Sequence, residues 1–333
     1  MRAPILSLLA AAALPLVASA APTPAYRLTE SIAGPDGGWD YARVDDAGQR
    51  LYVARGDAVT VVNLATKAVS SIEALQRGHA VVPLPGGKLL VTSGNDGTVR
   101  LVDLANGRES ASIAVGKKPD AAILDATAKH AYVMNAGSGT ISVINLATAK
   151  VVKTIAVKPA LEYAAFSTND MLFVNDEDAN EIETIDVVRG AMGKPIPLPG
   201  CEGPTGLGYD ARHDRLIAAC ANGKAAIVDV TAQRLTALVA IGAGPDAVVI
   251  DAKRGLAFIP CGANGVLEIL SIGGMTVERV ATVKTEIGAR TGALDSKTGT
   301  IYLPTAKFGP PVVGTKRQPM IPGSFHILSV RPA

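Results

Sequence analysis

The feature that most constrains this chain is a unit of about forty residues that repeats seven times along the sequence. Each unit reads as an apolar strand, a polar turn, a second apolar strand, a turn rich in Gly, Asn and Asp, a third strand and a loosely patterned fourth. Two independent landmarks keep the period. The first strands end at Asp45, Leu84, Asp125, Ser167, Asp210, Asp251 and Asp295, and the third strands end at Leu64, Leu104, Leu146, Val187, Val230, Ile272 and Val330.

Four short strands in each of seven units predict an all-β fold, a seven-bladed β-propeller with four-stranded antiparallel blades around a central channel. A β-solenoid would have shorter repeats, and a β-sandwich would not repeat itself seven times. The last unit stops after its third strand, near Val330, so we expect residues 26–32 at the N-terminus to supply its fourth strand. This pairing of the chain ends would close the ring and remove exposed sheet edges.

The N-terminus has the pattern of a secretory signal peptide. Arg2 precedes an apolar run over residues 5–17, and the small residues 18–20 form a cleavage site. The run is too short to span a bilayer, although a retained anchor is the alternative. We therefore expect residues 1–20 to be removed and residues 21–333 to form a single exported domain, periplasmic and without a membrane span.

The charges of the chain are nearly balanced. The net charge is +2 and the basic residues are scattered, so the sequence shows no basic footprint for nucleic acid, which is an unlikely partner. The 34 Gly and 21 Pro residues suit a chain with many turns. These properties favour a soluble, turn-rich domain over a nucleic-acid-binding one.

Several second strands carry variants of one short signature, at residues 51–54 (LYVA), 131–135 (AYVMN), 172–175 (LFVN) and 301–305 (IYLPT). The segments GKKPDAAILD and GAGPDAVVID add a Gly-x-x-Pro lead-in. On these residues the chain resembles the YVTN-repeat, YncE-like periplasmic β-propellers, within the quinoprotein amine dehydrogenase-like group, over nearly all of its mature length. The resemblance implies the propeller fold. It leaves the function open, because the group includes exported proteins of unknown role, nucleic-acid binders, lactonases and lyases.

One residue of each unit, five positions before the end of the first strand, is expected to face the channel at one mouth. A purely structural position there would more often be small or apolar. A gap placed differently in the second unit would bring Ala80 to this position in place of His79. Trp39, Tyr41 and Tyr163 are expected to form walls at the rim. The predicted ring is Asp40, His79, Asp120, Glu162, Thr205, Asp246 and Arg290.

Carboxylates beside one imidazole are suitable ligands for a divalent cation such as Mn²⁺, Ca²⁺, Mg²⁺ or Zn²⁺. The pKa values of such crowded carboxyl groups should rise unless a cation or Arg290 offsets their charge. The alternative is a solvated rim whose carboxylates cap the adjacent loops. The predicted metal ligands are His79, Asp120, Glu162 and Asp246.

Two loops are expected on the same face as the ring. The last unit carries an insertion at residues 307–323, between its second and third strands, which could bring Lys316 or Arg317 to an anionic ligand. Residues 175–181 form an acidic turn in the fourth unit, without the Gly that an EF-hand loop needs. This turn is expected to add negative charge near the mouth.

The three cysteines allow one disulfide in an exported protein, with one thiol left over. Cys201 precedes the first strand of the fifth unit and Cys220 ends its second strand, so this pair is the first choice. A bond between Cys220 and Cys261, or three buried free thiols, are the alternatives.

These observations predict an exported binding or interaction protein that uses the channel mouth for a small ligand, a cation or a protein partner. The alternative is a metal-assisted hydrolase or lyase acting on a lactone-like substrate at the same mouth, with His79 as a base. Single-stranded nucleic-acid binding is a third possibility that rests on the family resemblance alone.

Overall fold

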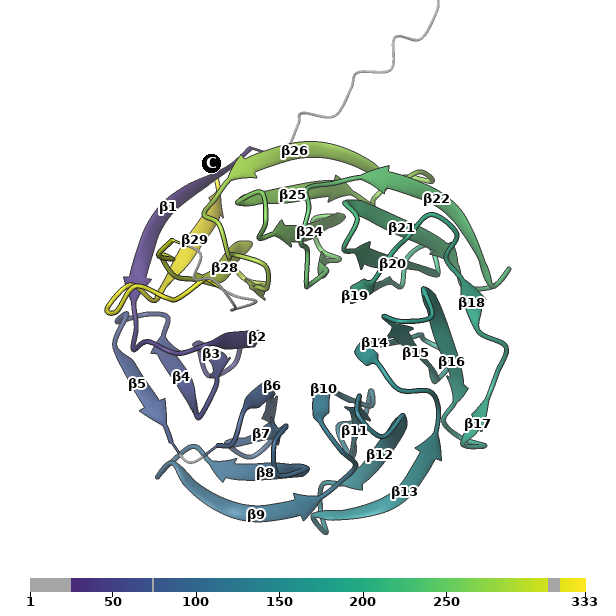
Figure 1. Cartoon of the computed structure of the whole chain (residues 1–333), viewed down its shortest axis with the longest axis horizontal. Helices are drawn as coiled ribbons and strands as arrows, with labels where there is room; N and C mark the ends of the chain where they lie inside the picture. The colour runs from purple at the N-terminus through teal and green to yellow at the C-terminus, as the bar shows by residue number, and fades with distance from the viewer. Residues whose placement is uncertain (1–24, 74, 311–317) are drawn as a thin grey trace, which may run out of the picture.

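The computed structural model describes residues 25–73, 75–310 and 318–333. Within these ranges seven antiparallel sheets stand in a ring around a central channel, as the sequence predicts (Figure 1). The described residues contain no helix, and therefore none of the length and hydropathy needed to cross a membrane. The predicted signal segment, residues 1–20, lies outside the described residues.

The first six blades are each built from consecutive strands, with the first strand nearest the channel (Figure 1). Blade 1 consists of β2 (Trp39–Asp45), β3 (Arg50–Arg55), β4 (Ala58–Asn63) and β5 (Val69–Ile72). Blade 2 consists of β6 (Gly78–Leu84), β7 (Lys88–Ser93), β8 (Thr98–Asp103) and β9 (Arg108–Ala114). Blade 3 consists of β10 (Pro119–Leu124), β11 (His130–Asn135), β12 (Thr140–Asn145) and β13 (Lys150–Ala156). Blade 4 consists of β14 (Leu161–Phe166), β15 (Met171–Asp176), β16 (Glu181–Asp186), β17 (Ala191–Met192) and β18 (Ile196–Pro197). Blade 5 consists of β19 (Pro204–Asp210), β20 (Arg215–Cys220), β21 (Lys224–Asp229) and β22 (Arg234–Ala240). Blade 6 consists of β23 (Val249–Asp251), β24 (Leu256–Cys261), β25 (Val266–Ser271) and β26 (Glu278–Lys284).

The seventh blade joins the two ends of the chain. It contains β27 (Ala293–Asp295), β28 (Thr300–Thr305), β29 (His326–Pro332) and, as its outermost strand, β1 (Tyr26–Ala33). β1 runs antiparallel to β29, with Tyr26 opposite Pro332 and Ala33 opposite His326. The predicted ring closure is confirmed. Closure leaves no blade one strand short of the others.

The second strand of each blade is buried on both faces because neighbouring blades cover it. In β3, the residues from Leu51 to Ala54 have no exposed surface, and β20 and β24 are buried along their whole length. Burial on both faces explains why these strands read as continuous apolar runs rather than as alternating patterns. The core is therefore distributed between blades.

The inner strands of the first five blades carry a β-bulge near their start. In blade 1, Trp39 pairs with Arg55 and Ala42 pairs with Val53, so Asp40 and Tyr41 lie inside the bulge. A bulge bends its strand and changes the direction of local side chains. In blade 2 the bulge contains residues 79 and 80, which places His79, and not Ala80, at the position equivalent to Asp40.

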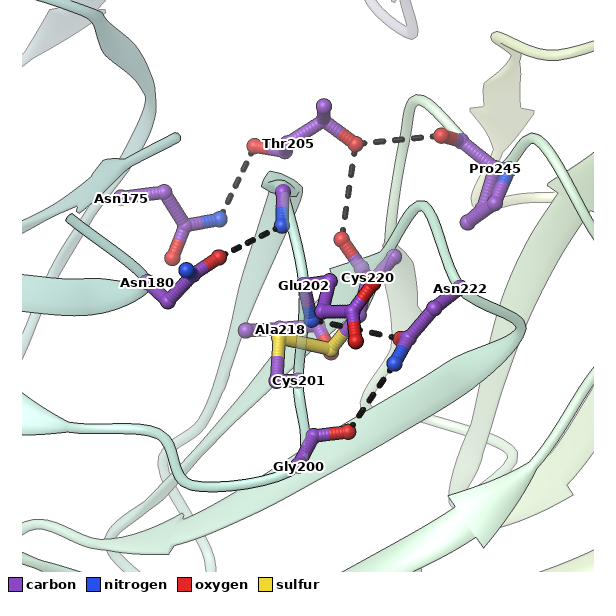
Figure 2. The surroundings of a disulfide bond; sticks show 12 residues. Asn175, Asn180, Gly200, Cys201, Glu202, Thr205, Ala218, Cys220, Asn222 and Pro245 are labelled. Atoms are coloured by element: carbon purple, nitrogen blue, oxygen red, sulfur yellow. Dashed lines mark hydrogen bonds between the residues drawn. A yellow bond between two sulfur atoms is a disulfide. The ribbon is translucent and has the colours of Figure 1, made fainter. Parts of the chain in front are cut away.

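The segment before the fifth blade is attached by a disulfide. Cys201 and Cys220 form this bond, with their Cα atoms 5.4 Å apart, and Cys261 is a buried free thiol. Hydrogen bonds surround the bond (Figure 2): Asn222 Nδ2 donates to the carbonyl oxygen of Gly200 at 3.1 Å. The disulfide holds the chain against β20 just before it enters the channel-lining strand.

The ends of the insertion at residues 307–323 lie against each other. The amide of Gly309 donates to the carbonyl oxygen of Pro319 at 2.8 Å, and Phe308 contacts Trp39 with ring centroids 6.1 Å apart. The insertion therefore covers the first residue of β2. Lys316 and Arg317 lie outside the described residues, so their predicted role stays a prediction.

Candidate functional site at the channel mouth

Three ring residues from consecutive blades form one compact group at the mouth. Asp40 on β2, His79 on β6 and Asp120 on β10 each place one potential ligand atom within 4.8 Å of the others. His79 Nδ1 lies 2.6 Å from Asp40 Oδ2 and 3.7 Å from Asp120 Oδ2. All three side chains are partly buried, with between 13% and 20% of each exposed, so they open toward the channel.

Hydroxyl groups from other blades hold the backbone of this group. Thr291 Oγ1 donates to the carbonyl oxygen of Asp40 at 2.7 Å, and Thr92 Oγ1 donates to that of Asp120 at 2.9 Å. Supporting contacts of this kind orient potential ligands before anything binds. The position of the carboxylates is thus fixed by more than their own strands.

Glu162 on β14 lies beside the group and has a different partner. The hydroxyl of Tyr41 donates to Glu162 Oε2 at 3.4 Å, and the rings of Tyr41 and Tyr163 lie 5.1 Å apart. Burial, together with the charges of Asp120 and Asp246, raises the pKa of Glu162 to about 10. Burial and the neighbouring carboxylates therefore favour the protonated form of Glu162.

Asp246 is paired with the one guanidinium of the ring. Arg290 Nε donates to Asp246 Oδ2 at 2.7 Å, and Arg290 also donates to the carbonyl oxygen of Trp39 at 2.9 Å. Burial and the charge of Asp40 raise the pKa of Asp246 to about 6, against the opposing effect of Arg290. The charge of Asp246 is therefore largely compensated within the protein.

The compact group retains protons to a higher pH than isolated side chains of these types. Burial and the charge of Asp40 raise the pKa of Asp120 to about 7, although His79 acts in the opposite direction. Burial favours the neutral imidazole of His79, but its hydrogen bond to Asp40 and the charges of Asp120 and Asp40 outweigh this and raise its pKa. A cation that binds here would take the place of these protons, because metal ligands must be deprotonated.

The structure brings together part of the predicted ligand set. His79 and Asp120 belong to the compact group, whereas Glu162 and Asp246 lie outside it. Asp40, predicted only as a ring residue, completes the group because blades 1, 2 and 3 are neighbours. Positions 40, 79 and 120 belong to three consecutive repeat units, and this order in the sequence could have identified Asp40 as the third ligand.

Two of the aromatic residues expected as walls of the rim are buried. Trp39 is 6% exposed and packs against Phe308 and Phe325, while Tyr41 is 5% exposed. The bulge turns Tyr41 into the channel, under the ring. Thr205 is also buried and donates to the carbonyl oxygen of Pro245 at 3.1 Å, so it connects blades.

A second group of carboxylates lies at the end of the fourth blade. Asp176, Glu181 and Glu183 also place ligand atoms within 4.8 Å of one another. Lys158 forms ion pairs with Glu181 and with Glu183, the latter at 2.9 Å. Because a lysine already pairs with two of its three carboxylates, this group is a weaker candidate for a metal than the group at the mouth.

The fold and the mouth define a seven-bladed β-propeller with a charged ring at one end of its channel. The model of the YncE-like β-propeller family matches residues 60–299, and the chain belongs to this family.

Two solved structures have a fold similar to that of this chain. One is titled Kuenenia stuttgartiensis hydrazine synthase; the match has 18% identity and a TM-score of 0.72, and covers 80% of this chain and 92% of that chain. The other is titled mitotic checkpoint complex; the match has 13% identity and a TM-score of 0.72, and covers 91% of this chain and 95% of that chain. At these identities the likeness concerns the fold alone. A comparison with curated proteins gives no match.

Proposed function

We propose that this protein is a binding module that holds a divalent cation at the channel mouth through Asp40, His79 and Asp120. One observation carries the proposal: donor atoms of two carboxylates and one imidazole, from three consecutive blades, lie within 4.8 Å of one another. A cation held by three protein ligands keeps coordination positions open. A small ligand or a protein partner would occupy these positions from the channel.

The donor set narrows the choice of cation. One imidazole nitrogen with two carboxylates suits Zn²⁺ or Mn²⁺ better than Ca²⁺, which prefers six to eight oxygen ligands. The same carboxylates repel a phosphate backbone, so nucleic acid is not among the proposed partners.

We also infer that the protein acts after export to the periplasm. The signal-peptide pattern of residues 1–20 supports this location. The disulfide between Cys201 and Cys220 is consistent with an oxidising compartment. Fractionation of cells that express the full chain tests the inference, because a protein retained in the cytoplasm would contradict it.

Cation binding is tested by calorimetry on residues 21–333 with Zn²⁺, Mn²⁺ and Ca²⁺. Asp120→Asn and His79→Gln should each weaken Zn²⁺ or Mn²⁺ binding by about tenfold or more, since each removes a ligand. His130→Gln is the matched control, because His130 pairs with a single carboxylate, that of Asp125, at 2.9 Å. Equal affinity in all four proteins, or no binding to the unmodified one, would reject the site.

A hydrolase or lyase at the same mouth is the second candidate. In this candidate His79 acts as the general base and not as a metal ligand. The observation that favours it is the hydrogen-bond distance of 2.6 Å between His79 Nδ1 and Asp40 Oδ2, because a carboxylate partner orients an imidazole for proton transfer. Turnover of a simple lactone by the metal-loaded protein, abolished in Asp120→Asn, would support this function. Cation binding without turnover would leave the binding module as the function.

A further inference from the structure

Below the ring, the channel contains a cavity of about 470 Å³. The inner strands of six blades contribute to its lining, and Tyr41 and Tyr163 lie at its end nearest the ring. Asp46 and Ser296, at the turns on the face opposite the mouth, mark its other end. This volume is in the range of small-molecule pockets.

Arg43 brings a positive charge into this cavity at a position where the other blades carry none. Arg43 lies opposite Tyr52, the third residue of β3, in the strand register. In each other blade, the inner-strand residue opposite the third residue of the second strand is the equivalent of Arg43. The guanidinium is therefore a departure from the repeat. The six equivalents are all apolar or Gly: Val82, Ile123, Ala165, Gly208, Val249 and Ala293.

The guanidinium of Arg43 has few partners. It donates to the hydroxyl of Tyr163 and lies 5.4 Å from the centre of that ring. Among the described residues, no ion pair joins Arg43 to a carboxylate. Asp46, the acidic residue of the lining, is already held by the Ser296 hydroxyl at 2.6 Å. Most of the five N–H donors of Arg43 are thus open to the cavity.

A half-buried cation without a carboxylate partner destabilises the fold unless something else satisfies it. Burial lowers the pKa of Arg43 from its usual value, yet the group remains charged at neutral pH. An arginine fork binds a carboxylate through two parallel hydrogen bonds. The missing partner is therefore best supplied by a bound anion.

We propose that the cavity binds an organic monocarboxylate with an apolar body, held through its carboxylate by Arg43. The body of the ligand would lie against apolar side chains such as Ile123, Phe166, Leu207 and Val248. A single guanidinium among apolar walls fits a monoanion better than a phosphate. The ligand enters from the face opposite the acidic mouth, so this site is separate from the cation site.

Calorimetry with 4-phenylbutanoate and its uncharged amide tests the proposal, with inorganic phosphate as a third probe. The carboxylate should bind at least about tenfold more tightly than the amide or phosphate, because only it satisfies both the fork and the apolar walls. Arg43→Met should weaken carboxylate binding by about tenfold or more, and Arg43→Lys by less, since it keeps the charge. Arg108→Met, an exposed change on β9, should have no effect.

The midpoint of thermal unfolding provides a second measurement. If Arg43 had a purely structural role, Arg43→Met would lower this midpoint. Without ligand, Arg43→Met should unfold at the same temperature as the unmodified protein or higher, since it removes an unpaired charge. The carboxylate should raise the midpoint of the unmodified protein but not that of Arg43→Met. A lower midpoint in Arg43→Met, equal binding of carboxylate and amide, or no binding at millimolar concentration would overturn the proposal.

Discussion

His79 Nδ1 and Asp40 Oδ2 lie 2.6 Å apart, although the two residues are 39 positions apart in the sequence and belong to different blades. The repeat explains the contact: each residue occupies the same place in the bulge of its own inner strand. Circular packing then brings these equivalent positions side by side. The contact links two of the three donors of the proposed cation site.

Cation affinity should increase with pH. Asp120, whose pKa is raised to about 7, and His79, whose pKa is also raised, must lose protons before a cation binds. Between pH 5.5 and pH 8 we expect the affinity to rise by about tenfold or more. Calorimetry in buffers of different ionisation enthalpy counts the released protons. An affinity that is flat across this range contradicts the proposed ligands.

The free energy of unfolding of the metal-free protein should receive a contribution from the mouth that falls as pH rises. A carboxyl group whose pKa is higher in the folded protein binds more protons there than in the unfolded chain, so the free energy of unfolding falls between the two pKa values. For Asp120 this window runs from 3.8 to about 7. The raised pKa of His79 acts in the same direction.

Asp120→Asn isolates this contribution. The variant should gain stability relative to the unmodified protein as pH rises from 5 to 8, because it removes a carboxylate that is ionised at an energetic cost. Denaturant unfolding at several pH values measures the difference, which cancels the titration of groups that do not interact with Asp120. A difference that shrinks with rising pH would show that the ionised form of Asp120 is stabilised instead.

Removing the cation of the ring should strengthen metal binding. Arg290 lies in the same ring as the compact group and compensates Asp246 at 2.7 Å. In Arg290→Met, the repulsion between the guanidinium and the bound metal disappears, and we expect a gain in affinity of about threefold to tenfold. Titrations at low salt, with Arg108→Met as the control, measure the effect. Weaker binding in Arg290→Met would show that Arg290 positions the site rather than opposing the metal.

The closing strand should be essential for a soluble ring. A chain that begins at Gly34 lacks β1 and exposes the edge of β29, which pairs with β1 from Tyr26 to Ala33. Open edges recruit other chains. We expect this truncation to aggregate, whereas a chain that begins at Ala21 stays monomeric in size-exclusion chromatography. A stable monomer without β1 would show that closure is dispensable.

Reduction should destabilise the protein through a single bond. The disulfide closes a loop with a sequence separation of 19 residues, for which the loss of chain entropy predicts about 3 kcal/mol of stabilisation. Cys220→Ser should unfold at a lower temperature and show no further response to reductant. Cys261→Ala keeps the bond and should respond as the unmodified protein does. A reductant response that survives in Cys220→Ser would place the bond elsewhere.

The fold could be predicted almost completely because its information is repeated. The spacing of strand ends such as Asp45, Asp125 and Asp210 specifies blade number, strand order and the need for a closing strand. Ring closure followed from counting strands, since the unit that ends near Val330 lacks a fourth. Each conclusion rests on several copies of one pattern, so local irregularities did not matter.

The details of the site were less predictable because they depend on single side chains. Spacing placed seven residues in one ring, but it did not show that Arg290 would pair with Asp246 or that Tyr41 would reach Glu162. Nor did it show that Trp39 would be covered by Phe308 of the insertion. Rotamers decide these pairings, and the contact of Tyr41 with Glu162 also depends on how blades 1 and 4 approach each other across the channel. Arg43 was missed because a charged residue in an apolar strand gives no periodic signal.

The bulge at the start of the inner strands has an evolutionary consequence. The residue it holds stands apart from the regular ladder of backbone hydrogen bonds, as Asp40 and His79 do. Exchanging such a side chain alters what the channel entrance recognises while the architecture beneath it stays intact. The positions that determine ligand specificity therefore differ from the positions that determine folding within the same repeat. Single substitutions at the bulge can give the same scaffold a new ligand.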